Sequence, residues 1–272
     1  MLTFIPTPIG NLEDISYRAV RVLSDSILVL CEDTRVSKRL FSLLSKKLNI
    51  DFDIKNKKFI SLHSHNEQQF IENLTDDFFV QTNAVYLTDA GMPTVSDPGA
   101  KLVHYCQKQN IEFEILPGAT ACTLAYAYSG FLTKEFLFFG FLDIKQQNRI
   151  TQLKKIVNDG FATVIYESPK RVMKLLDELI SINYQKDIFV AKELTKIYDS
   201  RYYGSVDEIY QKLKDETIKG EWVVVLDAKP PTKTTPISVD DIAKLDIPPK
   251  TKAKLLSKLT GKNTKEIYKE HI

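Results

Sequence analysis

The chain has 272 residues, of which 43% are hydrophobic and 26% are charged, and its formal net charge is only +2. This composition is typical of a globular protein with room for two cores, and the small net charge alone does not indicate a nucleic-acid partner. The apolar runs are much shorter than the ~18 residues of a membrane helix, and no signal peptide is evident. Because Cys31, Cys106 and Cys122 are scattered among apolar residues, we expect buried free thiols and a cytoplasmic protein.

The first 117 residues alternate short apolar runs with amphipathic stretches. They predict helices over 17–23, 36–48, 68–74 and from Ala100 onward. The expected strands are one that starts at Thr3 and four more over 26–31, 59–62, 84–87 and 113–116. Strands that alternate with helices favour a parallel five-stranded sheet in an N-terminal α/β domain over 1–117. The polar clusters follow strands, so we expect a ligand site at the carboxyl edge of this sheet.

The loop 88–99, which joins the fourth strand to the following helix, is the most distinctive stretch of the chain. Gly91 and Gly99 permit positive φ and close approach of the backbone, whereas Pro93 and Pro98 fix φ and make the loop stiff. Two aspartates add carboxylates to the same loop. A strand, a stiff loop and a helix in this order suit a ligand at the end of a parallel sheet, and we favour this interpretation over an ordinary tight turn.

The residues after Gly118 form a second pattern of strands and helices. Apolar runs over 136–142, 162–166, 187–191 and 222–226 predict strands, and stretches over 145–157 and up to Ile180 predict helices. We therefore expect a second α/β domain over 118–229.

A proline-rich stretch over 230–236 is typical of a linker, and the segment 237–272 predicts a small helix-turn-helix. Its expected helices are 239–244, 250–259 and 264–269. Over residues 250–270, Glu266 and Glu270 oppose a larger set of lysines, namely Lys250, Lys252, Lys254, Lys258, Lys262, Lys265 and Lys269. We expect a basic tail that contacts RNA, although such a charge run is also typical of a solvated helix face.

Several common cofactor and catalytic motifs are absent from the sequence. There is no Walker-type glycine loop, no Gly-x-Gly-x-x-Gly after the first strand and no Gly-x-Ser-x-Gly turn. His63 and His65 lie close to Glu67, but without cysteine partners or a known zinc spacing they favour a polar loop over a metal site. What remains is a set of short loops whose backbone groups suit a polar cofactor with an adenine and a ribose.

The motifs that follow the strands resemble, in the same order, those of the tetrapyrrole methylase superfamily. The resemblance extends over essentially the whole chain and is to the branch that methylates the 2′-hydroxyl of a cytidine in small-subunit ribosomal RNA. The matching stretches are TPIGNLEDI (7–15), CEDTR (31–35), SHNE (64–67), DAGMP (89–93), SDPG (96–99), PGATA (117–121), SG (129–130), GFL (140–142), YESP (166–169) and KELTK (192–196). Three residues depart from the family pattern: Met92 replaces a threonine, Asp143 a proline and Lys170 a histidine.

The resemblance implies two α/β domains of the tetrapyrrole methylase type and a helical tail, with S-adenosylmethionine as methyl donor in the cleft between the domains. It also implies 16S ribosomal RNA in the small ribosomal subunit as the substrate and a homodimer as the assembly, with no metal. By position, the implied cofactor-binding residues are Ile9, Gly10, Asp89, Ala90, Gly91, Met92, Thr120, Ala121, Tyr166 and Leu194.

A ribose hydroxyl is a weak nucleophile that loses a proton in such a reaction, so a base or a nearby cation helps. Charged residues that follow strands at one rim are the candidates, and we select Glu32, Arg35, Asp89, Lys192 and Glu193. Arg35 can clamp a phosphate, or it can simply pair with its acidic neighbours. Two other functions stay open at this point: methylation of a tetrapyrrole or corrin, and a non-catalytic RNA-binding module.

Overall fold

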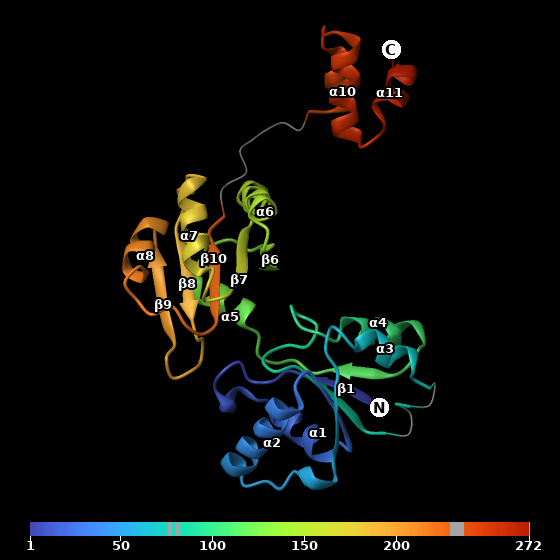
Figure 1. Cartoon of the computed structure of the whole chain (residues 1–272), viewed down its shortest axis with the longest axis vertical. Coiled ribbons are helices and arrows are strands. Elements are labelled where there is room, and N and C mark those ends of the chain that lie inside the picture. Colours follow the sequence, from blue (N-terminus) through green and yellow to red (C-terminus); the bar gives the residue numbers. More distant parts are fainter. Residues whose placement is uncertain (76–77, 80–81, 229–236, 272) are drawn as a thin grey trace. The chain divides into compact units, whose positions relative to one another are not determined.

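The computed structural model describes residues 1–75, 78–79, 82–228 and 237–271, with residues 269–271 described by their backbone alone. The chain divides into two compact units, Met1–Pro230 and Pro231–Ile272. Unit 1 contains two α/β lobes and unit 2 is helical (Figure 1). The linker predicted over 230–236 lies outside the described residues. Within the described ranges, no helix has both the length and the apolar character needed to cross a membrane.

The first lobe is built on a five-stranded parallel sheet in the order β3-β2-β4-β1-β5. Its strands are β1 (Leu2–Ile5), β2 (Leu28–Cys31), β3 (Lys58–Ser61), β4 (Ala84–Leu87) and β5 (Phe113–Ile115). Every residue of β1, β2 and β4 is buried, as expected for strands that are covered on both faces. The predicted parallel sheet is therefore confirmed.

Helices cover both faces of this sheet (Figure 1). They are α1 (Tyr17–Asp25), α2 (Thr34–Leu48), α3 (Glu67–Glu72) and α4 (Ala100–Lys108), and two short 3-10 helices lie at Leu12–Asp14 and Ile54–Asn56. Leu23 of α1 and Phe41 of α2 pack in the core on one face, whereas Leu102 and Cys106 of α4 pack on the other. The three cysteines are free and buried, as predicted.

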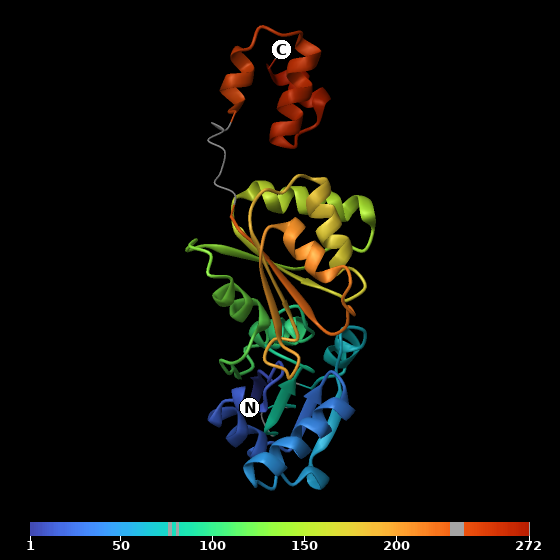
Figure 2. The same cartoon turned by 90° about the vertical axis from the view of Figure 1, so that its left-hand side faces the viewer.

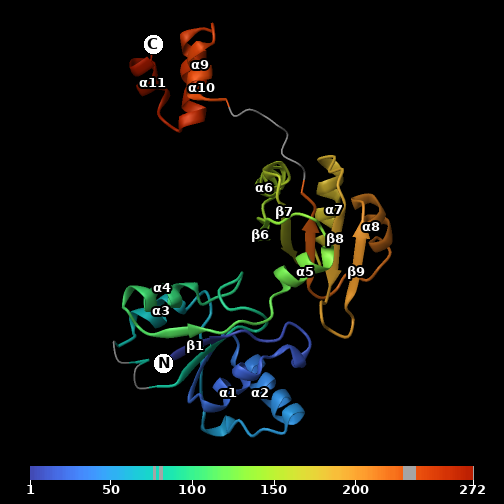
Figure 3. The same ribbon diagram turned by 180° about the vertical axis from the view of Figure 1, so that it is seen from behind.

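The second lobe contains a mixed sheet in the order β6-β7-β10-β8-β9. Its strands are β6 (Phe136–Phe141), β7 (Ala162–Glu167), β8 (Ile188–Lys192), β9 (Ser200–Gly204) and β10 (Trp222–Leu226). β6 and β7 run parallel, and the other pairings are antiparallel. One face is covered by α6 (Gln146–Asp159), α7 (Val172–Ser181) and α8 (Val206–Leu213), and the opposite face by α5 (Ala121–Ser129) (Figures 2 and 3).

Three elements of this lobe, α5, β9 and α8, are not predicted from the sequence. β9 lies at the edge of the sheet, and its residues alternate between exposed and half-buried, so no apolar run marks it. The start of α8 carries a signal that could have been used. The Ser205 side chain accepts a hydrogen bond from the backbone N–H of Glu208, and the Glu208 carboxylate accepts one from the backbone N–H of Ser205. Such a reciprocal capping box marks a helix start in sequence.

Unit 2 consists of α9 (Val239–Lys244), α10 (Pro249–Thr260) and α11 (Thr264–His271). Its small core is formed by Ile242, Ala253, Leu256 and Ile267. α10 ends at Gly261, which adopts φ +72° and so takes the left-handed conformation common after helices. The predicted helical segments are present, and their interaction with RNA stays a prediction.

Candidate functional site

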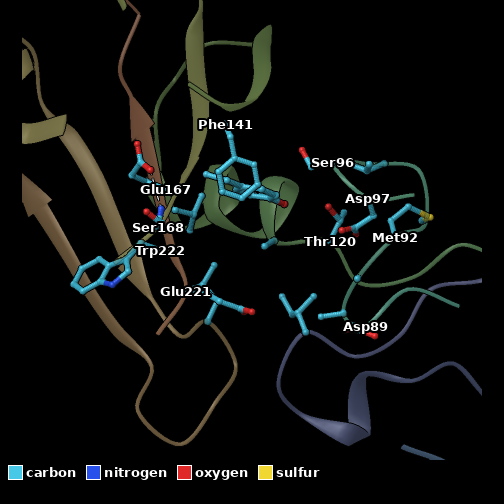
Figure 4. A pocket seen from close by; sticks show the side chains of 18 of the residues that line it. Asp89, Met92, Ser96, Asp97, Thr120, Phe141, Glu167, Ser168, Glu221 and Trp222 are labelled. Carbon is cyan, nitrogen blue, oxygen red and sulfur yellow. Dashed lines mark hydrogen bonds between the residues drawn. The ribbon is translucent and has the colours of Figure 1, made fainter. Parts of the chain in front are cut away.

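A cavity of about 450 Å3 lies in unit 1, where loops after the strands of the first lobe face the second lobe (Figure 4). The first lobe contributes residues that follow β1, β2 and β4, as expected for a ligand site at the carboxyl edge of a parallel sheet. Of the residues selected from the sequence, the cavity is lined by Ile9, Glu32, Asp89, Ala90, Gly91, Met92, Thr120, Ala121, Tyr166 and Leu194. Gly10, Arg35, Lys192 and Glu193 do not line it. Their roles, like those of the lining residues, stay predictions.

Backbone hydrogen bonds hold the first wall of the cavity in place. The N–H of Thr7 donates to the carbonyl of Gly91 (2.9 Å), and the N–H of Gly91 donates to the carbonyl of Thr7 (3.1 Å). This pair joins the loop after β1 to the loop after β4. Gly91 and Gly99 adopt φ values of +87° and +112°, and a Cβ at Gly99 would lie 2.7 Å from the Tyr86 ring. Glycine is therefore required at these turns, as the sequence analysis expects.

Glu67 supports the helix that follows this loop. Gly99 is the N-cap of α4. Because it has no side chain, it cannot accept a hydrogen bond from the free backbone N–H groups of the first helical turn. The carboxylate of Glu67, which is only 3% exposed, accepts from the N–H of Leu102 at 3.0 Å. Glu67 thus caps a neighbouring helix and does not line the cavity. His63 and His65 precede it, and the described residues contain no cluster of three or more His, Cys, Asp or Glu suited to a metal ion.

A buried ion-pair network holds the second wall. Arg149 of α6 is fully buried, with Nη2 2.6 Å from Oε2 of Glu167 and Nε 2.5 Å from Oε2 of Glu178. Glu167 ends β7, and its Oε1 accepts from the N–H of Ser168 (2.8 Å) and pairs with Nε of Arg171 (2.9 Å). Glu167 and Ser168 both line the cavity, so Arg149 supports that wall from behind.

Arg149 is not among the residues selected from the sequence, although the sequence contains a signal for it. Arg149 shares the buried face of α6 with Leu153 and Ile156, at spacings of four and seven residues. A charged residue in an apolar helical stripe requires a buried counter-charge.

The two lobes meet beside the cavity. Ile9 and Leu194 belong to the same apolar core, and the N–H of Asn11 donates to Oγ1 of Thr195 at 3.1 Å. Gly10 lies against this contact, just behind the cavity wall. Glu193 is held nearby, because its Oε1 accepts from Nζ of Lys196 and from the N–H of Glu221, both at 2.9 Å. These contacts fix the second-lobe loop that carries Leu194.

Two of the selected basic residues lie next to the cavity wall without lining the cavity. Nη2 of Arg35 lies 2.6 Å from Oδ2 of Asp33, and the Arg35 side chain is 88% exposed. Hydrogen bonds from Arg35 lower the pKa of Asp33 to about 2. Arg35 therefore pairs with Asp33, as the alternative interpretation expects, but its exposed guanidinium can still reach an outside ligand. Lys192 lies with Nζ 5.5 Å from the centre of the Trp222 ring.

The cavity is acidic. The cavity is lined by the carboxylates of Glu32, Asp89, Asp97 and Glu221, and by Glu167, which is paired with Arg149 and Arg171. Among the described lining residues there is no lysine, arginine or histidine. Burial is the main cause that raises the pKa of Glu32 and of Asp89. Burial, together with the neighbouring carboxylates, raises the pKa of Asp97 to about 7. Such a cavity favours a ligand with positive charge and disfavours phosphate groups.

Comparison with known proteins identifies the family. The family model described as "Tetrapyrrole (Corrin/Porphyrin) Methylases" matches residues 1–210. The chain belongs to the tetrapyrrole methylase family. The motif resemblance is therefore confirmed, together with the predicted fold class.

Two curated relatives resemble this chain over nearly its whole length. It is 41% identical over 273 residues to the "Ribosomal RNA small subunit methyltransferase I" of Campylobacter fetus, with 100% of both chains covered. It is 43% identical over 280 residues to the protein of the same name from Helicobacter pylori (strain ATCC 700392 / 26695), covering 98% of this chain and 96% of the relative.

A solved structure supports the fold alone. The native form of uroporphyrin III C-methyl transferase from Thermus thermophilus matches with a TM-score of 0.55 and 14% identity. The match covers 82% of this chain and 96% of that chain.

Proposed function

We propose that the protein transfers a methyl group from S-adenosylmethionine to the 2′-hydroxyl of a cytidine in 16S ribosomal RNA. The observation that carries this proposal is the acidic cavity, whose described wall has no cationic side chain and therefore suits the positive sulfonium of the donor. The names of the two full-length relatives support methyl transfer and a small-subunit ribosomal RNA substrate. The 2′-oxygen and the cytidine rest on the motif resemblance alone.

The cavity fits the donor in size and in chemical character. A volume of about 450 Å3 falls in the range of small-molecule sites. Ile9, Tyr166 and Leu194 offer apolar contact to an adenosyl group, and Glu32 and Asp89 offer carboxylate acceptors. Gly10 supports this wall from behind, and the other residues proposed to hold the donor are Ala90, Gly91, Met92, Thr120 and Ala121.

Alignment is the main contribution that this protein makes to the reaction. The donor supplies a methyl group that is already activated, and holding two reactants in line is worth up to about 7–11 kcal/mol in ideal models. The hydrogen-bonded pair of Thr7 and Gly91 fixes one wall, and Glu167 with its arginine partners fixes the other. A fixed site of this kind keeps the reacting groups at a constant separation.

The five charged residues selected from the sequence fall into two groups, those that line the cavity and those that do not. Glu32 and Asp89 line the cavity and suit contacts with the donor or the acceptor hydroxyl. Arg35 and Lys192 lie outside it, where we propose that their positive charge attracts the RNA backbone. Glu193 is engaged with Lys196, so we propose that it acts by holding its loop.

Because the cavity repels phosphate, the protein needs another surface for the RNA backbone, and we propose unit 2. In α10, Lys250, Lys254 and Lys258 are exposed and spaced four residues apart, so they form one stripe along the helix. α10 contains no acidic residue. Clustered lysines bind phosphates with an affinity that falls as salt rises.

Replacing these three lysines by glutamine should weaken binding to small-subunit RNA and lower the salt dependence of that binding. Each contact to a single-stranded phosphate contributes about 0.7 to the slope of log K against log salt, so losing three should reduce the slope by about 2. Deleting 237–272 should weaken RNA binding further and spare donor binding. A matched control replaces three exposed lysines of unit 1: Lys101, Lys108 and Lys155. If the two triple variants bound RNA with equal affinity, the proposal that unit 2 binds the RNA backbone would be refuted.

Mass spectrometry of nucleosides tests the reaction itself. Small-subunit RNA, alone and in assembled subunits, is incubated with the protein and S-adenosylmethionine, and a new 2′-O-methylcytidine is expected. A methylated tetrapyrrole in a parallel incubation would instead support the other activity found in this family. If titration with S-adenosylmethionine gave no binding heat in the calorimeter, the result would support a non-catalytic RNA-binding protein.

We also propose that the protein works in the cytoplasm as a homodimer. Sedimentation equilibrium of the purified chain tests the assembly, and a monomer at all concentrations would contradict it.

A further inference from the structure

One edge of the second sheet borders the cavity. β7 and β8 end at this edge and β10 begins there, because Trp222 at the start of β10 pairs with Glu167 on one side and with Lys192 on the other. The loops after β7, after β8 and before β10 each contribute residues to the cavity wall. Figure 4 shows Glu167, Glu221 and Trp222 together on the second-lobe side of the cavity. Charged residues on these loops therefore lie where a large substrate reaches the cavity.

Two lysines on these loops have no part in the site described so far. Lys170 directly follows Pro169, and Lys219 directly precedes Gly220, and both of these neighbours line the cavity. The two lysines are exposed, and within the described ranges neither amino group has a hydrogen bond or an ion pair. Their positive charges are therefore available to a ligand at the edge of the cavity.

The backbone that carries these lysines is held in place. The carbonyl of Ser168 accepts from the N–H of Arg171 at 2.9 Å, which closes the turn that contains Lys170. The carbonyl of Lys219 accepts from Nε1 of Trp222 at 3.0 Å. Each amino group thus extends from a fixed point beside the cavity.

The nearby carboxylates of the second lobe are engaged with other cations. Glu167 pairs with its two arginines, and Glu193 and Glu221 both pair with Lys196. None of these pairs uses the amino group of Lys170 or Lys219. The edge of the cavity thus carries positive charge that the acidic wall does not neutralise.

The proposed reaction requires opposite charges in neighbouring places. The sulfonium of the donor suits the acidic interior of the cavity, whereas the ribose that accepts the methyl group is joined to a phosphate on each side. The acidic wall repels these phosphates, so their binding needs positive charge outside the cavity. Lysine amino groups bind phosphates as point charges.

We propose that Lys170 and Lys219 bind the phosphates that flank the target nucleotide and so hold its 2′-hydroxyl at the cavity. This inference rests on the methyl transfer proposed above. The two lysines differ in task from the lysine stripe of unit 2, which binds the RNA backbone in general. A contact next to the reacting ribose aligns the acceptor with the methyl group, and alignment is the main contribution that the protein makes to the reaction.

The test is the kcat/KM of methyl transfer to small-subunit RNA at saturating donor, measured as a function of salt. The double variant Lys170→Gln/Lys219→Gln should lower kcat/KM by about 10- to 100-fold, because two charge-assisted contacts are lost. The slope of log kcat/KM against log salt should fall by about 1.4, at about 0.7 for each phosphate contact. Donor affinity by calorimetry should not change. Lys170→Arg/Lys219→Arg, which keeps both charges, should retain most of the wild-type kcat/KM.

The matched control is Lys134→Gln/Lys186→Gln. These two lysines are also exposed, but they precede β6 and β8 and so lie at the opposite edge of the same sheet. The control should keep the wild-type kcat/KM and salt dependence.

A change in the RNA identifies the group that the lysines contact. Small-subunit RNA is prepared with a neutral methylphosphonate at one of the two phosphates that flank the methylated nucleotide. This change should lower kcat/KM of the wild-type protein, and it should have little further effect in the single variant, Lys170→Gln or Lys219→Gln, that has lost the matching amino group. Effects that simply add in both single variants would overturn the assignment to these phosphates.

The remaining outcomes separate this proposal from the proposed function. If the wild-type protein methylates RNA and the double glutamine variant behaves like the control, the role of the two lysines alone is overturned. Weaker donor binding with a normal kcat/KM for RNA also overturns it, because the lysines would then pair with the carboxylate of the donor. A wild-type protein that transfers no methyl group to RNA refutes both proposals.

Discussion

Replacing Arg149 by methionine tests whether the buried network stabilises the wall of the cavity. Removing one partner of a buried ion pair generally costs about 3–5 kcal/mol, because the remaining charge stays buried without compensation. Glu167 would keep Arg171 at 2.9 Å and the N–H of Ser168. Glu178 would keep only Lys174, whose Nζ lies 4.0 Å away. The Glu178 carboxylate is thus left nearly uncompensated. We expect the free energy of unfolding to fall by about 3 kcal/mol, at the lower end of that range.

The assay is urea unfolding followed by tryptophan fluorescence. Trp222 is the single tryptophan of the chain, is 3% exposed and belongs to the same lobe as Arg149, so its signal reports on this lobe. Lys155→Met is the control, since Lys155 is exposed on the same helix and its replacement should change stability by no more than about 0.5 kcal/mol. Adding Glu178→Gln to Arg149→Met should recover part of the loss. The assigned role of the network is refuted if Arg149→Met has the same unfolding free energy as the control. It is also refuted if adding Glu178→Gln lowers the unfolding free energy further.

Two further predictions concern the loops of the cavity. Glu67→Ala should lower the stability of unit 1 by about 1–3 kcal/mol in a thermal melt, because the buried N–H of Leu102 loses its acceptor; Glu72→Ala, at the exposed end of the same helix, should have little effect. Gly10→Ala should weaken calorimetric binding of S-adenosylmethionine, because its Cβ would lie 2.5 Å from Oγ1 of Thr195 and 2.9 Å from the carbonyl oxygen of Leu194. Gly130→Ala, with nothing within 4 Å of the new Cβ, should leave binding intact, and equal binding by both variants would contradict the importance of the contact between the lobes.

The sequence predicts the first lobe well because its strands are buried on both faces. Continuous apolar runs such as 84–87 then mark each strand, and the glycines and prolines of 91–99 mark the loop that follows. The second sheet is harder to predict, since periodicity does not reveal that its strands pair mainly in antiparallel order. β9, at the exposed edge, leaves no apolar run at all.

The candidate site was predicted in part for a similar reason. Residues in compact motifs at the ends of strands, such as Asp89 after β4 and Tyr166 near the end of β7, line the cavity. Glu221 and Trp222 reach it from the start of β10, where no motif precedes them. Arg149 supports it from 18 residues before Glu167 in the chain, a contact that only the packing of α6 on the sheet creates. Sequence motifs thus locate the loops of a site, but not the side chains that tertiary packing brings to them.

The acidic wall of the cavity has a consequence for turnover. Methyl transfer converts a positively charged sulfonium into an uncharged thioether, so the proposed reaction removes the sulfonium charge that the acidic wall attracts. The spent donor then keeps its apolar and hydrogen-bonding contacts but loses the attraction between the sulfonium and the acidic wall. In the proposed reaction, the acidic wall therefore favours fresh donor over spent donor, so the loss of charge itself assists product release.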